Sequence, residues 1–439
     1  MRNTLQHRNW ISRMPLRVAS AALALAAVLV SGVITTQPAL AQTFTSLVSF
    51  DFTNGANPYN TSLVQGTDGN LYGTTLLGGA NGGGTVFKVT PTGTLTTLHS
   101  FAGAPTDGAS PWAGLILGTN GTFYGTTILG GANNRGTVFS MTSEGVVTLL
   151  YSFCSQTDCS DGSGPEAPLI QATNGNFYGT TSEGGANEYG TAFSITTGGT
   201  LKTVYNFCSV NGNVACLDGD APQAALVQAS NGTFYGTTPG GGASEVGTVF
   251  SLTSGGTLTT LYNFCSQADC TDGKNPYAGL VQATNGNFYG TTNTGGASYG
   301  TIFEISASGA LTVLHSFDGT DGFNSEGGNA LFQATNGKFY GTTYSGGADG
   351  DGTIFSLAVG LGPFVRTLPT SGTVGTAVTI LGTNLTGATS VTFNGTAATF
   401  TVVSSSEITT AVPTGATTGR VKVVTPSRTL TSNVNFRVP

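Results

Sequence analysis

The chain repeats one unit six times along most of its length. Three short markers recur in a fixed order, and the first is Tyr-Gly-Thr-Thr, with its tyrosine at Tyr72, Tyr124, Tyr178, Tyr235, Tyr289 and Tyr340. The second, Gly-Thr-(Val/Ala/Ile)-Phe, ends at Phe87, Phe139, Phe193, Phe250, Phe303 and Phe355. The third, (Ser/Asn)-Phe, ends at Phe50, Phe101, Phe153, Phe207, Phe264 and Phe317. Such a long fixed period is typical of repeat architectures, in which each unit packs against its neighbours.

Each unit has the pattern of four short β-strands. In the third copy we expect strands at residues 168–173, 177–181, 190–196 and 200–207. Asn174-Gly175 lies between the first two and favours a tight hairpin turn, because such turns need positive φ angles. The last strand alternates with a period of two, which predicts one shared face for Leu201, Thr203, Tyr205 and Phe207. Four strands in roughly 50 residues match one blade of a β-propeller.

The two ends of the repeat region complement each other. Residues 44–50 repeat the fourth-strand pattern alone, whereas the last copy ends after its third strand, at residues 352–357. We therefore expect 44–50 to form the missing outer strand of the last blade, since this pairing removes an exposed sheet edge. The sequence predicts an all-β fold with a six-bladed β-propeller over residues 42–361.

The markers resemble the Gloeo/Verruco-type (GloVer) tandem-repeat family of secreted bacterial proteins. The resemblance rests on Asn-Gly-x-(Phe/Leu)-Tyr-Gly-Thr-Thr and Gly-Thr-Val-Phe elements, and the first copy departs from it with Asp68-Gly69 in place of Asn-Gly. The family implies repeats with varied surface-anchoring ends. It implies no catalytic residue.

The pattern changes in residues 362–439, where six or seven short alternating segments predict a small β-sandwich. Thr367 to Gly375 contains Pro-x-Ser-Gly-x-x-Gly, and Gly-Thr-Asn-Leu and Val-Thr-Phe-Asn-Gly follow. These motifs resemble an IPT/TIG domain, an immunoglobulin-like module. The resemblance implies a spacer or binding role in an extracellular protein.

Residues 1–41 have the features of a signal peptide. Four arginines precede an apolar run, and Ala39-Leu40-Ala41 provides a cleavage site before Gln42. The apolar core is short for a membrane anchor. We therefore expect export to the periplasm, cell surface or exterior, and a mature chain that has no transmembrane segment and is a monomer.

Composition and charge narrow the class of partner. With 67 glycines and 8% charged residues, the chain is neither a coiled coil nor a charged disordered tail. Residues 42–361 contain 5 basic and 20 acidic residues, a net charge of −15. This argues against nucleic acid as a partner and favours cations or neutral polymers.

Six cysteines form three close pairs, each in a loop after a fourth strand: Cys154 and Cys159, Cys208 and Cys216, and Cys265 and Cys270. An even number of cysteines in an exported chain predicts disulfides, although six cysteines allow 15 connectivities. The alternative is a thiolate metal site, for which these spacings are atypical.

The same loops contain an aspartate before glycine in five of the six copies. We expect Asp107, Asp161, Asp218, Asp272 and Asp321 on one rim, with the aromatic residues Trp112 and Tyr277 near it. This rim would bind a cation or a polar ligand, since hard cations prefer oxygen ligands. The alternative is that each aspartate caps its own turn. No EF-hand pattern is present, so Ca²⁺ has no specific motif and no cofactor is predicted.

Catalytic patterns are scarce. His99 and His315 occupy a repeat position that Tyr151, Tyr205 and Tyr262 fill elsewhere, so a structural role is the simplest interpretation. We therefore predict a non-enzymatic extracellular binding or adhesion protein that recognises a glycan or protein ligand through the long loops. The alternative is a secreted polysaccharide-active enzyme, a glycosidase or lyase, that uses paired rim carboxylates.

Overall fold

The computed structural model describes residues 47–58, 63–66, 68–210, 216–229, 231–323, 331–347 and 353–439. Strands dominate this part of the chain, and its only helical turns are two short 3₁₀ segments, η1 (Thr157–Cys159) and η2 (Ala268–Cys270). No helix in these ranges is long and apolar enough to cross a membrane. The expected signal peptide lies outside the described residues.

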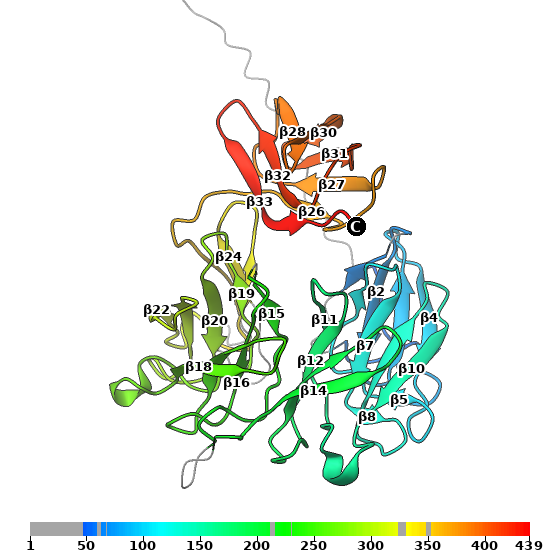
Figure 1. The fold of residues 1–439 in the computed structure, drawn as a ribbon, viewed down its shortest axis with the longest axis vertical. Helices are drawn as coiled ribbons and strands as arrows, with labels where there is room; N and C mark the ends of the chain where they lie inside the picture. Colours follow the sequence, from blue (N-terminus) through cyan, green and yellow to red (C-terminus); the bar gives the residue numbers. More distant parts are fainter. Residues whose placement is uncertain are drawn as a thin grey trace, which may run out of the picture. The chain divides into compact units, whose positions relative to one another are not determined.

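The repeats form consecutive antiparallel sheets, which Figure 1 shows in sequence from blue to yellow. Sheet 1 comprises β1 (Val64–Gln65), β2 (Leu71–Thr75), β3 (Thr85–Val89) and β4 (Leu95–Ser100). Sheet 2 comprises β6 (Ile116–Leu117), β7 (Phe123–Thr127), β9 (Thr137–Met141) and β10 (Val147–Ser152). Sheet 3 comprises β11 (Ile170–Gln171), β12 (Phe177–Thr181), β13 (Thr191–Ile195) and β14 (Leu201–Asn206).

The later repeats follow the same order. Sheet 4 comprises β15 (Val227–Gln228), β16 (Phe234–Thr238), β17 (Thr248–Leu252) and β18 (Leu258–Asn263). Sheet 5 comprises β19 (Val281–Gln282), β20 (Phe288–Thr292), β21 (Thr301–Ile305) and β22 (Leu311–Ser316). Sheet 6 has three strands, β23 (Phe332–Gln333), β24 (Phe339–Thr342) and β25 (Ile354–Leu357). The four expected strands of the third copy are therefore confirmed, the first of them much shorter than predicted.

One detail of the predicted alternation is wrong. In sheet 3, Thr203 pairs with Phe193 and Tyr205 pairs with Ala192, so Val204 is an extra residue in a β-bulge. A bulge shifts the residues that follow it to the opposite face of the strand. Leu201 accordingly packs against the core toward sheet 2, whereas Phe207 packs against the core toward sheet 4. The same shift occurs in sheets 1, 2, 4 and 5.

The core lies between consecutive sheets and explains the aromatic markers. The tyrosine of Tyr-Gly-Thr-Thr stacks on a phenylalanine of the next sheet, as Tyr72 does on Phe123 with ring centroids 4.2 Å apart. The phenylalanine that ends each fourth strand packs edge-on against the next sheet, as Phe101 does on Phe139 at 5.3 Å. These rings are fully buried. Contacts of this kind join each repeat to its neighbour.

The rest of the tetrapeptide also has a structural explanation. A Cβ at Gly73 would approach the ring of Phe87 to 2.7 Å, so the position requires glycine. The Thr74 hydroxyl donates to the Ala113 carbonyl of the next repeat at 3.1 Å, and the Thr75 hydroxyl lies 2.8 Å from that of Thr85. All these threonines are buried, so the hydrogen bonds satisfy polar groups that would otherwise destabilise the core.

The outer edge of sheet 6 differs from those of the other sheets. Residues 47–50 form no strand, and no described residue pairs with the outer side of β25. Ile354 is 83% exposed there, whereas the equivalent residues of the other sheets are buried. The ring of Phe50 nevertheless packs on Phe87 with centroids 5.2 Å apart, as fourth-strand phenylalanines do in later repeats. Residues 44–46 of the expected closing strand lie outside the described residues.

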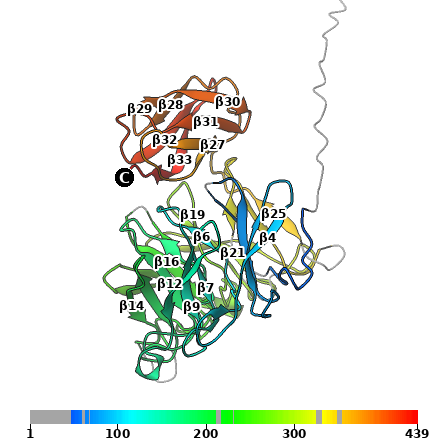
Figure 2. The ribbon, with the colours of Figure 1, turned by 90° about the vertical axis from the view of Figure 1, so that its right-hand side faces the viewer.

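The C-terminal strands form two four-stranded sheets, drawn in orange to red in Figure 2. One contains β26 (Arg366–Leu368), β27 (Ala377–Leu381), β31 (Glu407–Ala411) and β30 (Phe400–Ser404). The other contains β29 (Thr396–Ala398), β28 (Ser390–Phe393), β32 (Gly419–Val424) and β33 (Thr429–Phe436). Residues of both sheets, including Ile380 and Val421, share one buried core.

Candidate functional site

Two kinds of long loop meet at one end of the repeated sheets. The loop before each first strand pairs with the loop between the second and third strands of the same sheet, as Ser163 pairs with Glu183. In the second repeat this pairing forms a small extra sheet of β5 (Gly108–Ala109) and β8 (Leu129–Gly130). The next repeat continues the contact, since the Gly164 amide donates to the Arg135 carbonyl at 3.0 Å. We call the surface made by these two loop sets the long-loop face.

Three of the five expected rim aspartates are buried. Asp161, Asp218 and Asp272 are at most 2% exposed, and donors of their own loops surround each carboxylate. Asp272 accepts from the Tyr262 hydroxyl at 2.8 Å, from the Ser266 amide at 2.9 Å and from the Ser266 hydroxyl at 3.0 Å. Each of these carboxylates therefore has an internal structural role, as in the alternative in which aspartate caps its turn.

The pKa of each tyrosine that donates to one of these buried aspartates is raised. Burial, followed by the hydrogen bond to Asp218, raises the pKa of Tyr205 to about 12. A neutral phenol is the hydrogen-bond donor that the carboxylate needs, so the pair is stable in this form across the physiological pH range.

The other two aspartates pair with the two histidines. His99 Nε2 lies 2.9 Å from Asp107 Oδ2, and His315 Nε2 lies 2.7 Å from Asp321 Oδ2. Burial opposes ionisation of Asp107, but hydrogen bonds from His99 and from the Ala102 and Gly108 amides outweigh it and lower its pKa. The histidines therefore serve as anchors equivalent to the tyrosines. The five aspartates lie in five separate loops, and no three acidic, His or Cys residues in the described ranges are grouped to hold a metal.

The three predicted disulfides are confirmed. Cys154 bonds to Cys159, Cys208 to Cys216 and Cys265 to Cys270, so each bridge closes a loop within one repeat. The Cys159 carbonyl accepts from the Gly185 amide at 2.9 Å, which ties the bridged loop to the neighbouring loop of the long-loop face.

The positions that vary between repeats gather on the long-loop face. A proline precedes the first strand of five repeats, and the residue after it is Tyr59, Trp112, Glu166, Gln223 or Tyr277. The residue after Tyr-Gly-Thr-Thr varies in the same way: Leu76, Ile128, Ser182, Pro239, Asn293 and Tyr344. Of these residues the sequence interpretation singled out only Trp112 and Tyr277. Aligning the six copies column by column would have identified the others.

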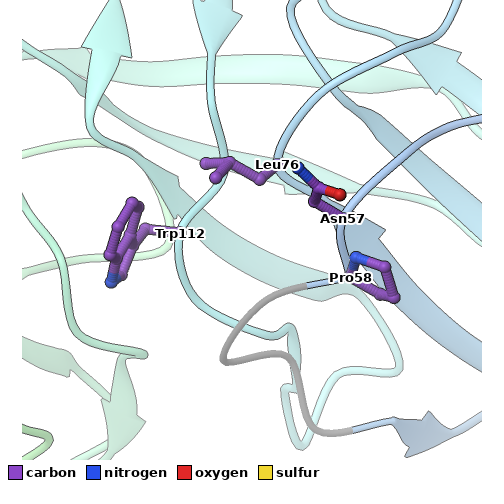
Figure 3. Close-up of a pocket in the computed structure, with 4 residues that line it drawn as sticks. All are labelled: Asn57, Pro58, Leu76 and Trp112. Atoms are coloured by element: carbon purple, nitrogen blue, oxygen red, sulfur yellow. The ribbon is translucent and has the colours of Figure 1, made fainter. Parts of the chain in front are cut away.

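Trp112 lines a pocket between the first two repeats (Figure 3). The pocket has a volume of about 340 Å³, and its other lining residues are Asn57, Pro58 and Leu76. Tyr277 occupies the same repeat position before β19 and is half-buried. The two predicted aromatic residues therefore belong to different repeats.

Acidic residues lie in the same loops of the third and fourth repeats. Glu166 accepts from the Ser182 hydroxyl at 2.7 Å, and burial, with a smaller effect of the Glu183 charge, raises the pKa of Glu166. Glu183 lies 3.6 Å from Arg135 of the preceding repeat. Burial also raises the pKa of Asp220, with added repulsion from Glu245 and Asp218.

Solved structures of several enzymes are similar to this chain. Virginiamycin B lyase from Staphylococcus aureus has a TM-score of 0.44 at 11% identity, over 82% of this chain and 96% of that chain. A streptogramin B lyase has 0.44 at 15% identity, over 70% and 86%. A gluconolactonase from Xanthomonas campestris has 0.40 at 14% identity, over 70% and 88%.

Sequence comparison identifies the family. No curated protein matches the chain. A family model described as the Gloeobacter/Verrucomicrobia repeat matches residues 30–217 and again residues 213–405, so the second match extends past the expected end of the repeats at 361. Because these matches span far more than half of the sequence and contain all the repeated markers, the chain belongs to the Gloeobacter/Verrucomicrobia repeat family.

Proposed function

We propose that this protein is an exported, non-enzymatic binding or adhesion protein that recognises a glycan or protein ligand through its long-loop face. The contrast between the two parts of each repeat carries this proposal. The buried aromatic residues and threonines repeat almost unchanged, whereas the residues that follow the proline and the Thr-Thr pair differ from copy to copy. A rigid framework with one variable surface is typical of recognition proteins.

The disulfides support the same proposal. They close three loops of the long-loop face, and such bridges are typical of oxidising extracellular compartments. A braced loop loses less conformational freedom on binding than a mobile one.

We also propose the finer architecture that this function requires. The repeats over 42–361 form a six-bladed β-propeller, in which residues 44–50 supply the outer strand of the last blade. Residues 362–439 form an IPT/TIG-type domain, whose two sheets around one core are the layers of an immunoglobulin-like sandwich.

Binding to arrays of glycans and extracellular proteins tests the function. On the long-loop face we would replace Glu183 and Lys274 with alanine. Glu144, which is exposed in a short turn between β9 and β10, gives the control variant Glu144→Ala. We expect the double variant to lose binding and the control to keep it. A ligand that both proteins bind equally well would place recognition outside the part of the face that the third and fifth repeats form.

The alternative function is a secreted polysaccharide-active enzyme. Glu166 favours it, because a half-buried carboxyl with a raised pKa is suited to general acid catalysis. Mass spectrometry of every bound glycan after prolonged incubation would detect products. Cleavage that Glu166→Gln abolishes would establish the enzyme, and intact ligands would support binding alone.

A further inference from the structure

We propose that the pocket between the first two repeats is a subsite for one pyranose ring of an uncharged polysaccharide. This inference rests on the proposed binding function and names the class of ligand for one part of the long-loop face. The pocket belongs to two repeats, since Asn57, Pro58 and Leu76 come from the first and Trp112 comes from the second (Figure 3).

The size of the pocket suits one sugar ring. Its volume of about 340 Å³ is at the lower end of the range for small-molecule sites, roughly 300–1,000 Å³. A pocket of this size accommodates one ring of a chain whose neighbouring rings extend over the surface. The long-loop face has further exposed apolar side chains in the same two repeats, Leu77 in the first and Leu129 in the second.

The lining residues match the two kinds of surface that a pyranose presents. A sugar ring has an apolar face of C–H groups, which packs on an indole ring and on aliphatic side chains. It also has hydroxyls at its edge, which need hydrogen-bond partners. Trp112, Leu76 and Pro58 supply the apolar surface. The exposed Asn57 amide has donors and an acceptor, and it makes no side-chain hydrogen bond within the described residues.

Charge determines which sugars fit. None of the four lining residues ionises, so no lining group compensates a carboxylate or sulfate on the ligand. The repeat region as a whole is strongly acidic, which repels anionic chains such as polyuronates. Neutral polysaccharides avoid both costs.

The sequence combines an indole with an aliphatic side chain only at the junction of the first two repeats. At the position of Trp112 the following copies have Glu166, Gln223 and Tyr277, and at the position of Leu76 they have Ile128, Ser182, Pro239 and Asn293. The same framework therefore places an indole and an aliphatic chain together at one junction.

The sequence offers a direct probe of this site. The chain contains two tryptophans, Trp112 and Trp10 of the expected signal peptide, so a Trp10→Phe variant has Trp112 as its sole tryptophan whether or not that peptide is removed. We would titrate this variant with cello-, xylo- and chitohexaose and with the hexamer of galacturonic acid, and record tryptophan emission. At least one neutral hexasaccharide should shift the emission saturably, and the uronate should not.

Calorimetry of three variants completes the test. Trp112→Ala should weaken binding of that neutral sugar about ten-fold or more, because the stacking surface is lost. Trp112→Tyr keeps an aromatic ring and should restore part of the affinity. Glu144→Ala, in the turn between β9 and β10 outside the long-loop face, is the control and should bind as the unaltered protein does.

The outcomes separate this inference from the proposed function. Glycan binding that Trp112→Ala leaves unchanged overturns the subsite and leaves the binding function intact, as does uronate binding at Trp112. If a protein ligand binds at Trp112 and no sugar binds there, the sugar inference alone is overturned. Binding to neither glycans nor proteins overturns both.

Discussion

At the residue scale, one aspartate anchors the loop before the first strand in the second to sixth repeats. The aspartate accepts hydrogen bonds from the tyrosine or histidine of the preceding strand and from amides of its own loop. In repeats with a disulfide the aspartate is fully buried, whereas the side chain of Asp321, in a loop without cysteines, is 40% exposed. The aspartate is therefore expected to contribute a different amount to the free energy of unfolding in different copies.

This difference predicts unequal effects of one substitution. Asp272→Asn replaces one carboxylate oxygen with an NH₂ group that cannot accept from the Ser266 or Gln267 amide, so we expect a loss of about 1–3 kcal/mol in the free energy of unfolding. Asp321→Asn in the exposed pair should cost less than about 1 kcal/mol. Urea denaturation of both variants measures the two values. Equal losses would show that burial of the loop carboxylate does not matter.

The partly buried setting of Glu166 predicts that the stability of the fold depends on pH. Because burial raises its pKa in the folded state, ionisation at neutral pH destabilises the fold, while below its ordinary value near 4.5 the carboxyl is protonated in both states. Glu166→Gln keeps an acceptor for the Ser182 hydroxyl and removes the ionisation. It should raise the melting temperature at pH 7 by on the order of 1–2 °C.

The stabilisation by Glu166→Gln should disappear as the pH falls toward 4. Glu188→Gln, at an exposed position in a loop of the same sheet, is the control and should have no such profile. A melting temperature of Glu166→Gln that stays raised at pH 4 would contradict the role of ionisation.

At the element scale, the glycines of the loops have two different functions. Gly175 has a φ of +87° in the hairpin turn, and an added Cβ would meet open space. Gly190 has a φ of +91°, and an added Cβ would collide with the Thr181 carbonyl oxygen and would lie 3.0 Å from Pro222 of the next repeat. The first glycine serves the turn alone, and the second also permits close approach of two repeats.

The two glycines form a matched pair for mutation. Gly175→Ala should cost about 1–2 kcal/mol, the usual price of a left-handed backbone for a residue with a Cβ. Gly190→Ala adds an overlap with backbone that cannot move freely, so its loss should be clearly larger, about 3 kcal/mol or more. Thermal unfolding of both variants measures this difference. Similar losses would indicate that the backbone near Thr181 relaxes easily.

At the scale of the whole molecule, stability is transmitted from each sheet to the next. Each interface contains the same stacked pair and edge-on pair of aromatic rings, from Tyr72 and Phe123 in the first interface to Tyr289 and Phe339 in the last. Such a row is stable only when its terminal sheets are covered. The two ends of this row are the exposed edge of β25 and the repeat region's first segment, residues 44–50, whose sequence has the fourth-strand pattern.

Ile354 reports directly on closure. If residues 44–50 cover β25, Ile354→Asp buries a charge and should destabilise the protein by about 3 kcal/mol or more. If the edge is open, the change should stay within about 0.5 kcal/mol. If the edge is covered, deletion of residues 42–50 should lower the melting temperature by more than the loss of the contact between Phe50 and Phe87 explains. If the edge is open, the melting temperature should fall by no more than that loss explains. An Ile354→Asp variant that is as stable as the unaltered protein would overturn the closed propeller.

The strands, tight turns and disulfides could be predicted because local sequence decides them. Asn174-Gly175 needs no distant contact to form its turn, and Cys265 and Cys270 are close in the chain whatever the tertiary structure. The six copies reinforce each pattern, and they made the four-strand unit predictable.

Other features depended on contacts between repeats, which no single segment encodes. The bulge at Val204 arises where one strand must present Leu201 to one interface and Phe207 to the next. Asp161 and Asp272 are buried because the surrounding loops fold over them, although Asp-Gly alone equally suits an exposed rim. The pocket at Trp112 and the buried setting of Glu166 likewise depend on loops brought together from separate segments. Backbone propensity and sequence spacing act within one repeat, whereas burial and pKa depend on neighbouring groups in space, so only the tertiary structure decided them.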